Sequence, residues 1–290
     1  MSIVGIVGAG VMGTGLAFDA ASAGHAVVLV DNQPEALRRA RDEIRQQCRM
    51  SRLLHDREID ASEVLGRIEA GTDPGTLAPA ELVVENVPEK WETKRTVHRR
   101  LAEVCTEDCV IVVNTSAVPI TRIAGLLPAP ERVIGVHFMN PVPLKKSVEL
   151  IPGFHTSAET VARTKHFLGT IGKMPIEVAD SCGFVSNRVL MLTVNEAIFL
   201  VYERVADAST VDRVFRDCFG HPMGPLQTAD LIGLDTILYS LEVLQDGFGD
   251  DKFRPCPLLR QMVFAGLHGQ KSGQGFYDYA STAAPLAADR

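Results

Sequence analysis

The sequence lacks both a long apolar run and a paired cysteine motif. No stretch of its 290 residues reaches the roughly eighteen consecutive apolar residues that a membrane-spanning helix needs. Its six cysteines include no two C-x-x-C motifs, which argues against a zinc ribbon. We therefore expect no spanning helix, no metal centre, and free thiols in a reducing compartment.

An excess of basic residues is also missing. The chain has 29 Lys and Arg against 36 Asp and Glu, for a formal net charge of −7. This balance argues against nucleic-acid binding, although a local positive patch can still bind an anionic ligand. The first residues show neither the basic segment nor the cleavage site of a secretory signal. We expect a cytoplasmic protein with no nucleic-acid or membrane partner.

The first 180 residues alternate between short β-branched runs and segments with helical periodicity. Such alternation, with nearly continuous apolar strands, is typical of a parallel sheet covered by helices on both faces. The predicted strands cover 3–7, 26–30, 82–85, 110–114, 133–137, 148–151 and 175–178. The predicted helices cover 13–22, 34–54, 90–106, 120–126 and 158–171. The fold class is therefore α/β, a Rossmann-like doubly wound and mostly parallel sheet.

Strand-like runs end near residue 180, and an all-α C-terminal domain is expected beyond it. Helical stretches are predicted at 184–205, 209–219, 228–247 and 257–266. We divide the chain into a nucleotide-binding domain at 1–180 and a helical domain at 181–290. The stretch 185–201 is apolar enough to be buried on most sides, either in the domain core or in a subunit interface.

A glycine-rich turn, GAGVMG, follows the first strand at residues 8–13. Its G-x-G-x-x-G spacing suits a tight turn, close approach of a pyrophosphate, and close packing of the next helix. Asp31 ends the second strand, where a carboxylate suits the ribose 2′-OH of NAD. The competing interpretation is an ordinary turn with Asp31 in an unrelated surface loop. The predicted contacts to NAD from this turn are Gly8, Gly10, Val11, Met12 and Gly13.

Polar residues also follow two later strands. Ser116 comes just after the run 110–114, and His137 ends the run 133–137. Glu149 lies twelve residues further on, inside an apolar strand, where a carboxylate is costly unless it is paired. An imidazole is its natural partner, so we predict that Glu149 orients His137 as a base. The competing interpretations are a structural His137 and a Ser116 that caps the helix beginning near Ile120.

The motifs together resemble those of the L-3-hydroxyacyl-CoA dehydrogenase family over nearly the whole length. Their order and spacing make a chance match improbable. They are GAGVMG at 8–13, VVENVPEKWETK at 83–94, NTSAVPIT at 114–121, GVHFMNPVP at 135–143, VELI at 148–151, GFVSNR at 183–188, HPMGP at 221–225, DLIGLDT at 230–236 and KSGQGFYDY at 271–279.

The resemblance implies a role for each catalytic candidate. His137 would take the proton of the substrate 3-hydroxyl, Glu149 would hold His137, and Ser116 would hydrogen-bond near the reacting oxygen. Asn187 would position the substrate carbonyl, a role suited to an amide donor, or else satisfy backbone groups at the domain junction. The resemblance also implies NAD contacts from Glu89, Lys94, Asn114, Asn140 and Lys271.

Some positions depart from the usual family pattern and leave the thioester carrier open. The residues at Met139, Ser147 and the segments 86–88 and 181–183 differ from those usual in the family's motifs. The helix 34–54 carries no lysine, but it carries arginines at 38, 39, 41, 45, 49 and 52, which bind phosphates well. CoA and an acyl-carrier protein are both compatible with this helix.

We therefore predict an NAD-dependent oxidoreductase acting on a 3-hydroxyacyl thioester, as a homodimer formed through the helical domain. One alternative is a dehydrogenase of glyceryl-acyl-carrier protein in the biosynthesis of polyketide extender units. Another is a non-catalytic NAD-binding structural protein. Asp230 and Asp235 are expected at helix ends or on the surface. The other histidines expected to be solvated are His25, His55, His98, His155 and His166.

Overall fold

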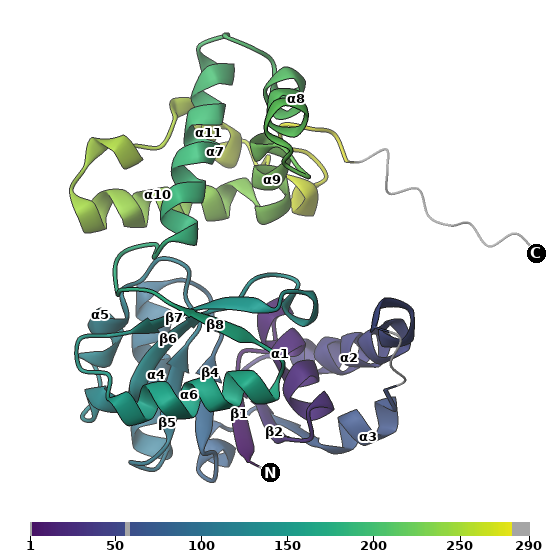
Figure 1. Ribbon diagram of the computed structural model, residues 1–290, viewed down its shortest axis with the longest axis vertical. Coiled ribbons are helices and arrows are strands. Elements are labelled where there is room, and N and C mark those ends of the chain that lie inside the picture. Colours follow the sequence, from purple (N-terminus) through teal and green to yellow (C-terminus); the bar gives the residue numbers. More distant parts are fainter. Residues whose placement is uncertain (1, 56–58, 280–290) are drawn as a thin grey trace, which may run out of the picture. The chain divides into compact units, whose positions relative to one another are not determined.

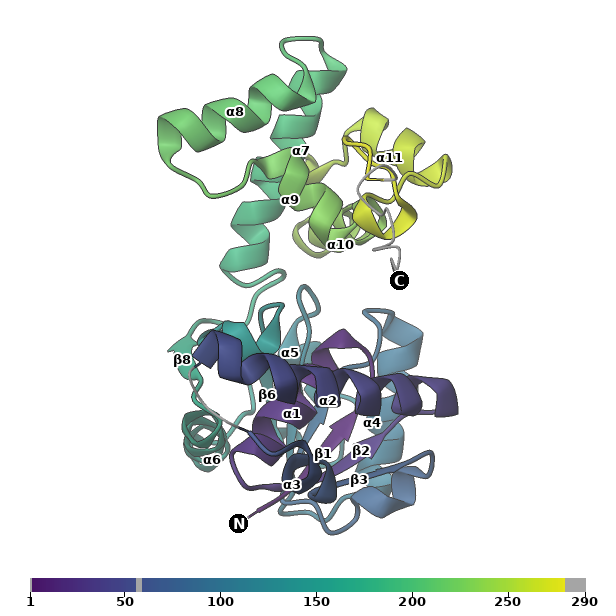
Figure 2. The same ribbon diagram turned by 90° about the vertical axis from the view of Figure 1, so that its right-hand side faces the viewer.

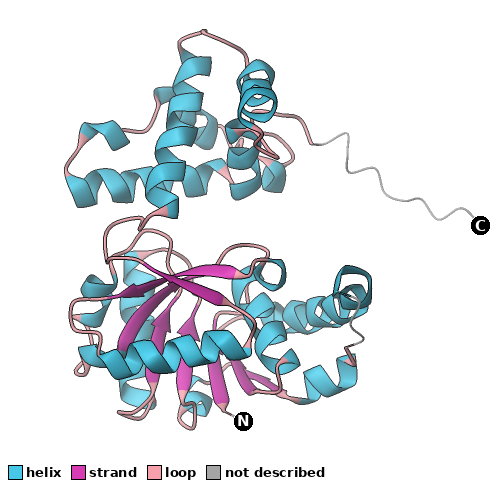
Figure 3. Cartoon of the chain, viewed as in Figure 1, coloured by secondary structure: helices cyan, strands magenta, loops and turns pink. Residues whose placement is uncertain are grey.

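The computed structural model describes residues 2–55 and 59–279, with side chains omitted at 52–55. It divides into two compact units, Met1–Phe184 and Val185–Arg290 (Figures 1 and 2). The first unit holds the sheet, and the second is built from helices (Figure 3).

The sheet of the first unit has eight strands in the order β3-β2-β1-β4-β5-β6-β7-β8. All neighbours pair in parallel except β6 and β7. The predicted mostly parallel, doubly wound sheet is confirmed, but β3 was missed because its four residues are mostly polar or small and only partly covered. The strands are β1 Ile3–Val7, β2 Ala26–Val30, β3 Ile68–Gly71, β4 Leu82–Glu85, β5 Val110–Val113, β6 Val133–His137, β7 Ser147–Pro152 and β8 Met174–Glu177.

Helices cover both faces of this sheet (Figures 1 and 3). Residues of α1, α2, α3 and α6 pack in one apolar cluster, and residues of α4 and α5 pack in a second. Successive strand residues enter opposite clusters, as Ile6 and Val7 of β1 do, because side chains alternate across a strand. The helices are α1 Val11–Ser22, α2 Pro34–His55, α3 Ala61–Gly66, α4 Trp91–Val104, α5 Ile120–Ala124 and α6 Ala158–Thr170.

The one antiparallel pair of the sheet has a local cause. The connection from β6 to β7 covers residues 138–146 and contains only a short 3-10 turn, Val142–Leu144. A parallel return needs a crossover of a dozen or more residues, so β7 runs back beside β6. The resulting register places His137 opposite Glu149.

The second unit contains five α-helices among its described residues. One helix was predicted over 228–247, and this prediction is wrong: Gly233 divides the stretch into two helices with a φ of 104°, a backbone conformation open mainly to glycine. No helix in residues 2–55 or 59–279 has the length and apolarity to cross a bilayer. The helices are α7 Ser186–Tyr202, α8 Ala208–Phe219, α9 Pro225–Ile232, α10 Leu234–Phe248 and α11 Pro257–Phe264.

Asp230 lies in the last turn of α9, in agreement with the expected helix-end position, but it is fully buried and is not a surface residue. Its carboxylate accepts hydrogen bonds from the backbone N–H groups of Phe276 and Tyr277, each at 3.0 Å, and from the Tyr279 hydroxyl at 3.1 Å. These bonds fasten the segment 276–279 to α9. The partners lie more than forty positions away in the chain, so local sequence carries no sign of them.

Candidate active site

The glycine turn connects β1 to α1, and each glycine meets a different constraint. Gly8 has a φ of 94°, and its N–H donates to the Val30 carbonyl at 2.8 Å. A Cβ on Gly13 would lie 1.8 Å from the Gly8 carbonyl oxygen, whereas a Cβ on Gly10 would meet no heavy atom within 4 Å. The first and third glycines therefore serve the protein's own packing, and the second leaves open space at the start of a helix, where N–H groups can bind phosphate.

This difference predicts opposite effects for two alanine substitutions. Gly10→Ala is expected to leave the unfolding temperature unchanged, because the φ of −76° suits alanine, and to weaken NADH binding at least about tenfold by filling space that a pyrophosphate needs. Gly13→Ala is expected to lower the free energy of unfolding by about 1–3 kcal/mol through overpacking. Thermal denaturation and NADH titration check both variants, and equal behaviour of the two would contradict the assignment.

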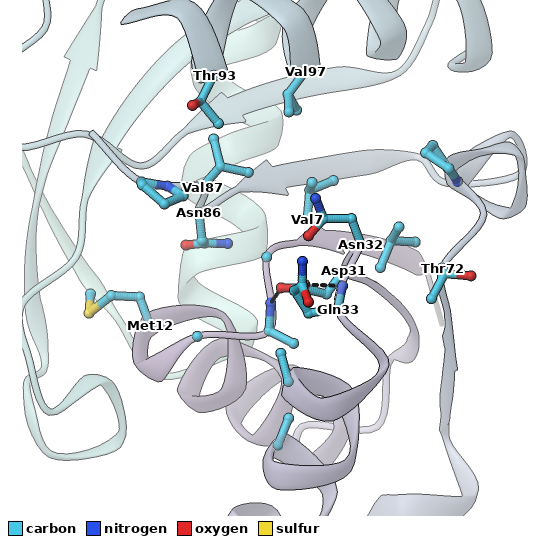
Figure 4. Close-up of a pocket in the computed structure, with 18 of the residues that line it drawn as sticks. Val7, Met12, Asp31, Asn32, Gln33, Thr72, Asn86, Val87, Thr93 and Val97 are labelled. Atoms are coloured by element: carbon cyan, nitrogen blue, oxygen red, sulfur yellow. Dashed lines mark hydrogen bonds between the residues drawn. The ribbon is translucent and has the colours of Figure 1, made fainter. Parts of the chain in front are cut away.

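Asp31, just after β2, faces the same turn. Its carboxylate accepts hydrogen bonds from Ala9 N–H at 2.7 Å and Gln33 N–H at 2.8 Å. The interpretation of Asp31 as part of an unrelated surface loop is therefore wrong. Asp31 lines a cavity of about 760 Å³. Thr93 and Val97 of α4 also point toward this cavity (Figure 4). Its volume and its glycine, carboxylate and apolar lining suit a dinucleotide.

His137 and Glu149 form the predicted pair. The Nδ1 atom of His137 lies 2.8 Å from Oε2 of Glu149, and both side chains are about nine-tenths buried, with 11% and 8% exposed. Because a carboxylate only accepts hydrogen bonds, Nδ1 carries the donated proton. In the neutral imidazole Nε2 then has a free electron pair, and Nε2 lies 3.1 Å from the Ser116 hydroxyl oxygen. Ser116, His137 and Glu149 thus form a hydrogen-bonded row, and His137 Nε2 is the nitrogen in it that can accept a proton.

Ser116 does not cap the helix that begins at Ile120. The carboxylate of Asp180 does so, accepting from the backbone N–H groups of Ile120 and Thr121, both at 2.8 Å. The capping interpretation of Ser116 is therefore wrong, and the hydroxyl of Ser116 is turned to His137. No sequence signal pointed to Asp180, because it lies sixty positions from its partner.

The loop that carries Ser116 is held by Glu89. One oxygen of its carboxylate accepts hydrogen bonds from the N–H groups of Ser116 at 3.0 Å and Ala117 at 3.1 Å, and from the Thr115 hydroxyl. Asn114 fixes the other end of the loop, because its amide donates to Asn86 Oδ1 at 2.8 Å. The predicted cofactor residues Glu89 and Asn114 thus lie beside the hydrogen-bonded row of Ser116, His137 and Glu149.

A buried ionic cluster behind this loop escaped the sequence analysis. The ammonium group of Lys94 lies 3.0 Å and 3.1 Å from the two carboxylate oxygens of Glu85, 3.3 Å from Glu89 and 3.1 Å from the Asn114 carbonyl. His98 Nε2 lies 2.8 Å from Glu85. Glu85, Lys94 and His98 are fully buried, so the expectation of a solvated His98 is wrong. The sequence did offer one signal: His98 lies four residues after Lys94, which places both side chains on the same face of a helix.

The cluster keeps its carboxylate ionised. Burial pushes the pKa of Glu85 upward, but Lys94 and His98 outweigh that effect and hold the pKa below its usual value of 4.5. Burial likewise acts to lower the pKa of Lys94, and the two carboxylates outweigh it, so this pKa is raised. Both directions favour the charged pair in the folded protein.

Acid should weaken the contribution of Glu85 to stability. Because its pKa is lowered on folding, this contribution is present above pH 4.5 and is lost as pH falls through the lower folded-state pKa. At neutral pH, Glu85→Gln leaves Lys94 short of a partner and is expected to cost about 3–5 kcal/mol of unfolding free energy. Urea unfolding of both proteins from pH 7 downward should show this difference shrinking below pH 4.5. A difference independent of pH would contradict the prediction.

Three further site residues were predicted, and their roles remain predictions. Asn140 is exposed three positions after β6. Asn187 lies in the first turn of α7. Lys271, in the 3-10 turn Gln270–Ser272, forms an ion pair with Asp235 of the α10 first turn at 2.5 Å.

The other histidines that were expected to be solvated have different outcomes. His25 is buried, and its Nε2 lies 2.8 Å from the Thr170 hydroxyl, so the expectation of a solvated ring is wrong there. His155 and His166 are exposed, as expected. The side chain of His55 lies outside the described residues.

Family models match both units of the chain. Residues 3–181 match the model described as "3-hydroxyacyl-CoA dehydrogenase, NAD binding domain". Residues 183–279 match "3-hydroxyacyl-CoA dehydrogenase, C-terminal domain". The glycine turn, Asp31 and the cavity lie in the first of these regions, and the prediction of NAD as cofactor is confirmed.

The names of similar proteins agree with these models. The chain is 44% identical over 275 residues to "Probable 3-hydroxybutyryl-CoA dehydrogenase" of Bacillus subtilis, covering 94% of this chain and 96% of that protein. It is 41% identical to a 3-hydroxybutyryl-CoA dehydrogenase of Bradyrhizobium diazoefficiens, covering 95% and 94%. The crystal structure of (S)-3-hydroxybutyryl-CoA dehydrogenase from Ralstonia eutropha matches with a TM-score of 0.90 and 38% identity, covering 96% and 99%. The chain therefore belongs to the 3-hydroxyacyl-CoA dehydrogenase family and is an NAD-dependent oxidoreductase.

Proposed function

We propose that the protein oxidises the 3-hydroxyl group of a short 3-hydroxyacyl-CoA, such as 3-hydroxybutyryl-CoA, or reduces the corresponding ketone. The single observation that carries the proposal is the position of His137, hydrogen-bonded to Glu149 through one ring nitrogen and facing Ser116 through the other. The names of the similar enzymes in Bacillus subtilis and Bradyrhizobium diazoefficiens support this choice of substrate.

The proposed reaction transfers a proton to His137 and a hydride to the cofactor. His137 Nε2 accepts the proton of the substrate O3–H while the Ser116 hydroxyl hydrogen-bonds to the same oxygen. Glu149 stabilises the imidazolium that forms, because its carboxylate faces Nδ1 at 2.8 Å. Bound NAD supplies the acceptor for the hydride that leaves C3. The ketone and one proton are released, and the proton passes from His137 to water.

The other predicted site residues take supporting roles in this proposal. Glu89 and Asn114 hold the loop of Ser116 and border the nicotinamide end of the cofactor. Lys94 reaches the same edge through its pair with Glu89. Asn140 and Lys271 contact the cofactor, and Asn187 positions the substrate carbonyl. We assign residues 1–180 to cofactor binding and 181–290 to substrate binding and dimerisation.

The direct test is NADH formation from NAD and 3-hydroxybutyryl-CoA by purified protein. We expect saturable turnover with NAD and a much lower kcat/KM with NADP, because Asp31 at the end of β2 repels a 2′-phosphate. Tight NADH binding without turnover of any 3-hydroxyacyl thioester would favour the structural alternative and contradict the proposal.

The carrier of the thioester needs its own comparison. Helix α2 exposes Arg39, Arg41 and Arg49, and its Arg38 and Arg45 form ion pairs with acidic neighbours. Exposed guanidinium groups suit the phosphates of CoA, and also a phosphopantetheine arm on a carrier protein. We propose CoA as the carrier. A higher kcat/KM with glyceryl-acyl-carrier protein than with 3-hydroxybutyryl-CoA would select the carrier-bound alternative.

The helical unit also supports the proposed homodimer. Val189 of α7 and Phe219 of α8 are 61% and 64% exposed, although α7 buries Met191, Val194 and Ile198. A groove of about 410 Å³ beside α7 is lined mainly by apolar groups, including Leu190, Phe215 and Met223. Exposed apolar patches of this kind mark association surfaces. Light scattering is expected to give a dimer mass at micromolar concentration, and a monomer mass would contradict this part of the proposal.

A further inference from the structure

We call Ser116, His137 and Glu149, which act together in the proposed function, the catalytic row. The ionic cluster around Glu85 connects to this row by an unbroken series of hydrogen bonds. We infer that Glu85 is a positioning residue for the reaction: through Lys94 and Glu89 it fixes the loop that carries Ser116. This inference rests on the proposed function, in which Ser116 and His137 act on the substrate oxygen. It adds a residue that touches neither substrate nor cofactor.

Glu85 is the starting point of this series. It is the last residue of β4, and its carboxylate accepts from Val87 N–H at 2.7 Å, from Lys94 at 3.0 Å and from His98 at 2.8 Å. The side chains of Glu85, Lys94 and His98 are 0% exposed. Water therefore cannot replace a lost partner, and a change at Glu85 must be met by movement of the others.

Lys94 carries the constraint from Glu85 to the loop. Its ammonium group lies between Glu85 and Glu89 and also donates to the Asn114 carbonyl at 3.1 Å. Asn114 is the first residue after β5, two positions before Ser116. The position of the Lys94 ammonium group therefore fixes Asn114, where the loop begins, and also the Glu89 carboxylate, which holds the loop.

Glu89 completes the series at the catalytic row. It is held by Lys94 through one oxygen, while its other oxygen binds the N–H groups of Ser116 and Ala117. Ser116 in turn lies 3.1 Å from His137. A shift of Glu89 therefore moves the hydroxyl that, with His137, meets the reacting oxygen.

His98 strengthens the hold on Glu85 from a third side. Its Nε2 faces the carboxylate, and a carboxylate only accepts, so the ring donates from Nε2. Within the described part of the chain, its Nδ1 atom is buried without a hydrogen-bond partner. The hydrogen bond to Glu85 is therefore the polar interaction that accounts for a histidine at this buried position.

The test compares Glu85→Gln with Glu85→Asp, and uses Glu107→Gln as an exposed control. Glu85→Gln keeps the size of the side chain but removes the charge opposite Lys94. We expect kcat to fall by about tenfold to a hundredfold, since displacement of a reacting geometry by about 1 Å has effects of this size. The KM for the acyl thioester should stay within about twofold, because substrate-binding groups are unchanged. The deuterium isotope effect with 3-²H-labelled substrate should rise.

Glu85→Asp keeps the charge and loses only reach, so it is expected to recover most of the lost kcat. A purely structural Glu85 would lower the unfolding temperature and the amount of folded enzyme. The isotope effect of Glu85→Gln would then equal that of wild type, and Glu85→Asp would have no lost kcat to recover. That result would overturn the inference. If Glu85→Gln does not fold, Glu85→Asp is compared directly with wild type, and an unchanged isotope effect there also overturns it.

A binding measurement separates this inference from the proposed function. Trp91, the single tryptophan of the chain, is the first residue of α4, so energy transfer from it to bound NADH reports cofactor affinity without turnover. We expect Glu85→Gln to weaken NADH binding by at least about threefold and Glu107→Gln to leave it unchanged. A wild type without dehydrogenase activity would refute the proposed function, whereas equal NADH affinity in wild type and Glu85→Gln would refute the positioning role.

Discussion

His137→Gln is expected to lower kcat for oxidation of 3-hydroxybutyryl-CoA by about 10²- to 10⁴-fold, the range typical for loss of a positioned general base. Glutamine fills a similar volume and can still hydrogen-bond, but its amide accepts no proton at neutral pH. The substrate proton must then leave to water without this acceptor, although the residue at this position is about nine-tenths buried. Initial rates of NADH formation measure the effect.

The controls for this variant are binding and a second histidine. NADH affinity is expected to stay within about threefold of wild type, because His137 is not among the residues that line the dinucleotide cavity. His155→Gln, at an exposed position, should have wild-type activity. Unchanged kcat in His137→Gln would remove the base from the mechanism, whatever the cofactor affinity.

Glu149→Gln is expected to lower kcat by about 10²-fold or more, because loss of the group that orients a catalytic histidine has effects of 10⁴ in serine proteases. The carboxylate accepts from His137 Nδ1 at 2.8 Å. A glutamine amide can instead donate to Nδ1, which places the ring proton on Nε2, where the substrate proton has to go. The loss should therefore appear in kcat more than in the KM for NAD.

An exposed glutamate provides the matched control for Glu149→Gln. Glu177 of β8 forms a surface ion pair with Lys165, and Glu177→Gln is expected to keep wild-type kcat, because such pairs contribute little. Steady-state kinetics of both variants at several pH values check the prediction. Equal kcat for Glu149→Gln and wild type would show that Glu149 neither orients nor stabilises the imidazole.

The site could be predicted from sequence where each residue lies at the end of a recognisable strand. Gly8, Asp31, Ser116 and His137 follow apolar runs that belong to one parallel sheet, and the carboxyl ends of such strands share an edge. The pairing of Glu149 with His137 could not be read from strand ends in this way, because it depends on the register between β6 and β7. Only the short connection from β6, which contains no α-helix, turns β7 antiparallel and sets Glu149 opposite His137.

The features that sequence missed depend on contacts far along the chain. The half-buried carboxylate of Asp180 and the buried carboxylate of Asp230 accept hydrogen bonds from backbone N–H groups more than forty positions away, and backbone groups leave no trace in residue patterns. His98 was assigned to solvent because a lone histidine in a charged helix has no visible partner. Its partner, Glu85, was treated as the end of an apolar strand. Strand β3 and the break at Gly233 were missed because short or glycine-linked elements carry weak periodicity.

Hydride transfer coupled to His137 is tested most directly with 3-²H-labelled 3-hydroxybutyryl-CoA and NAD in a single turnover. We expect wild-type protein to move the label into the reduced nicotinamide ring, with a rate that falls at least about 10²-fold in His137→Gln. Label that stays on the acyl group, or moves equally fast in both proteins, would contradict the assignment.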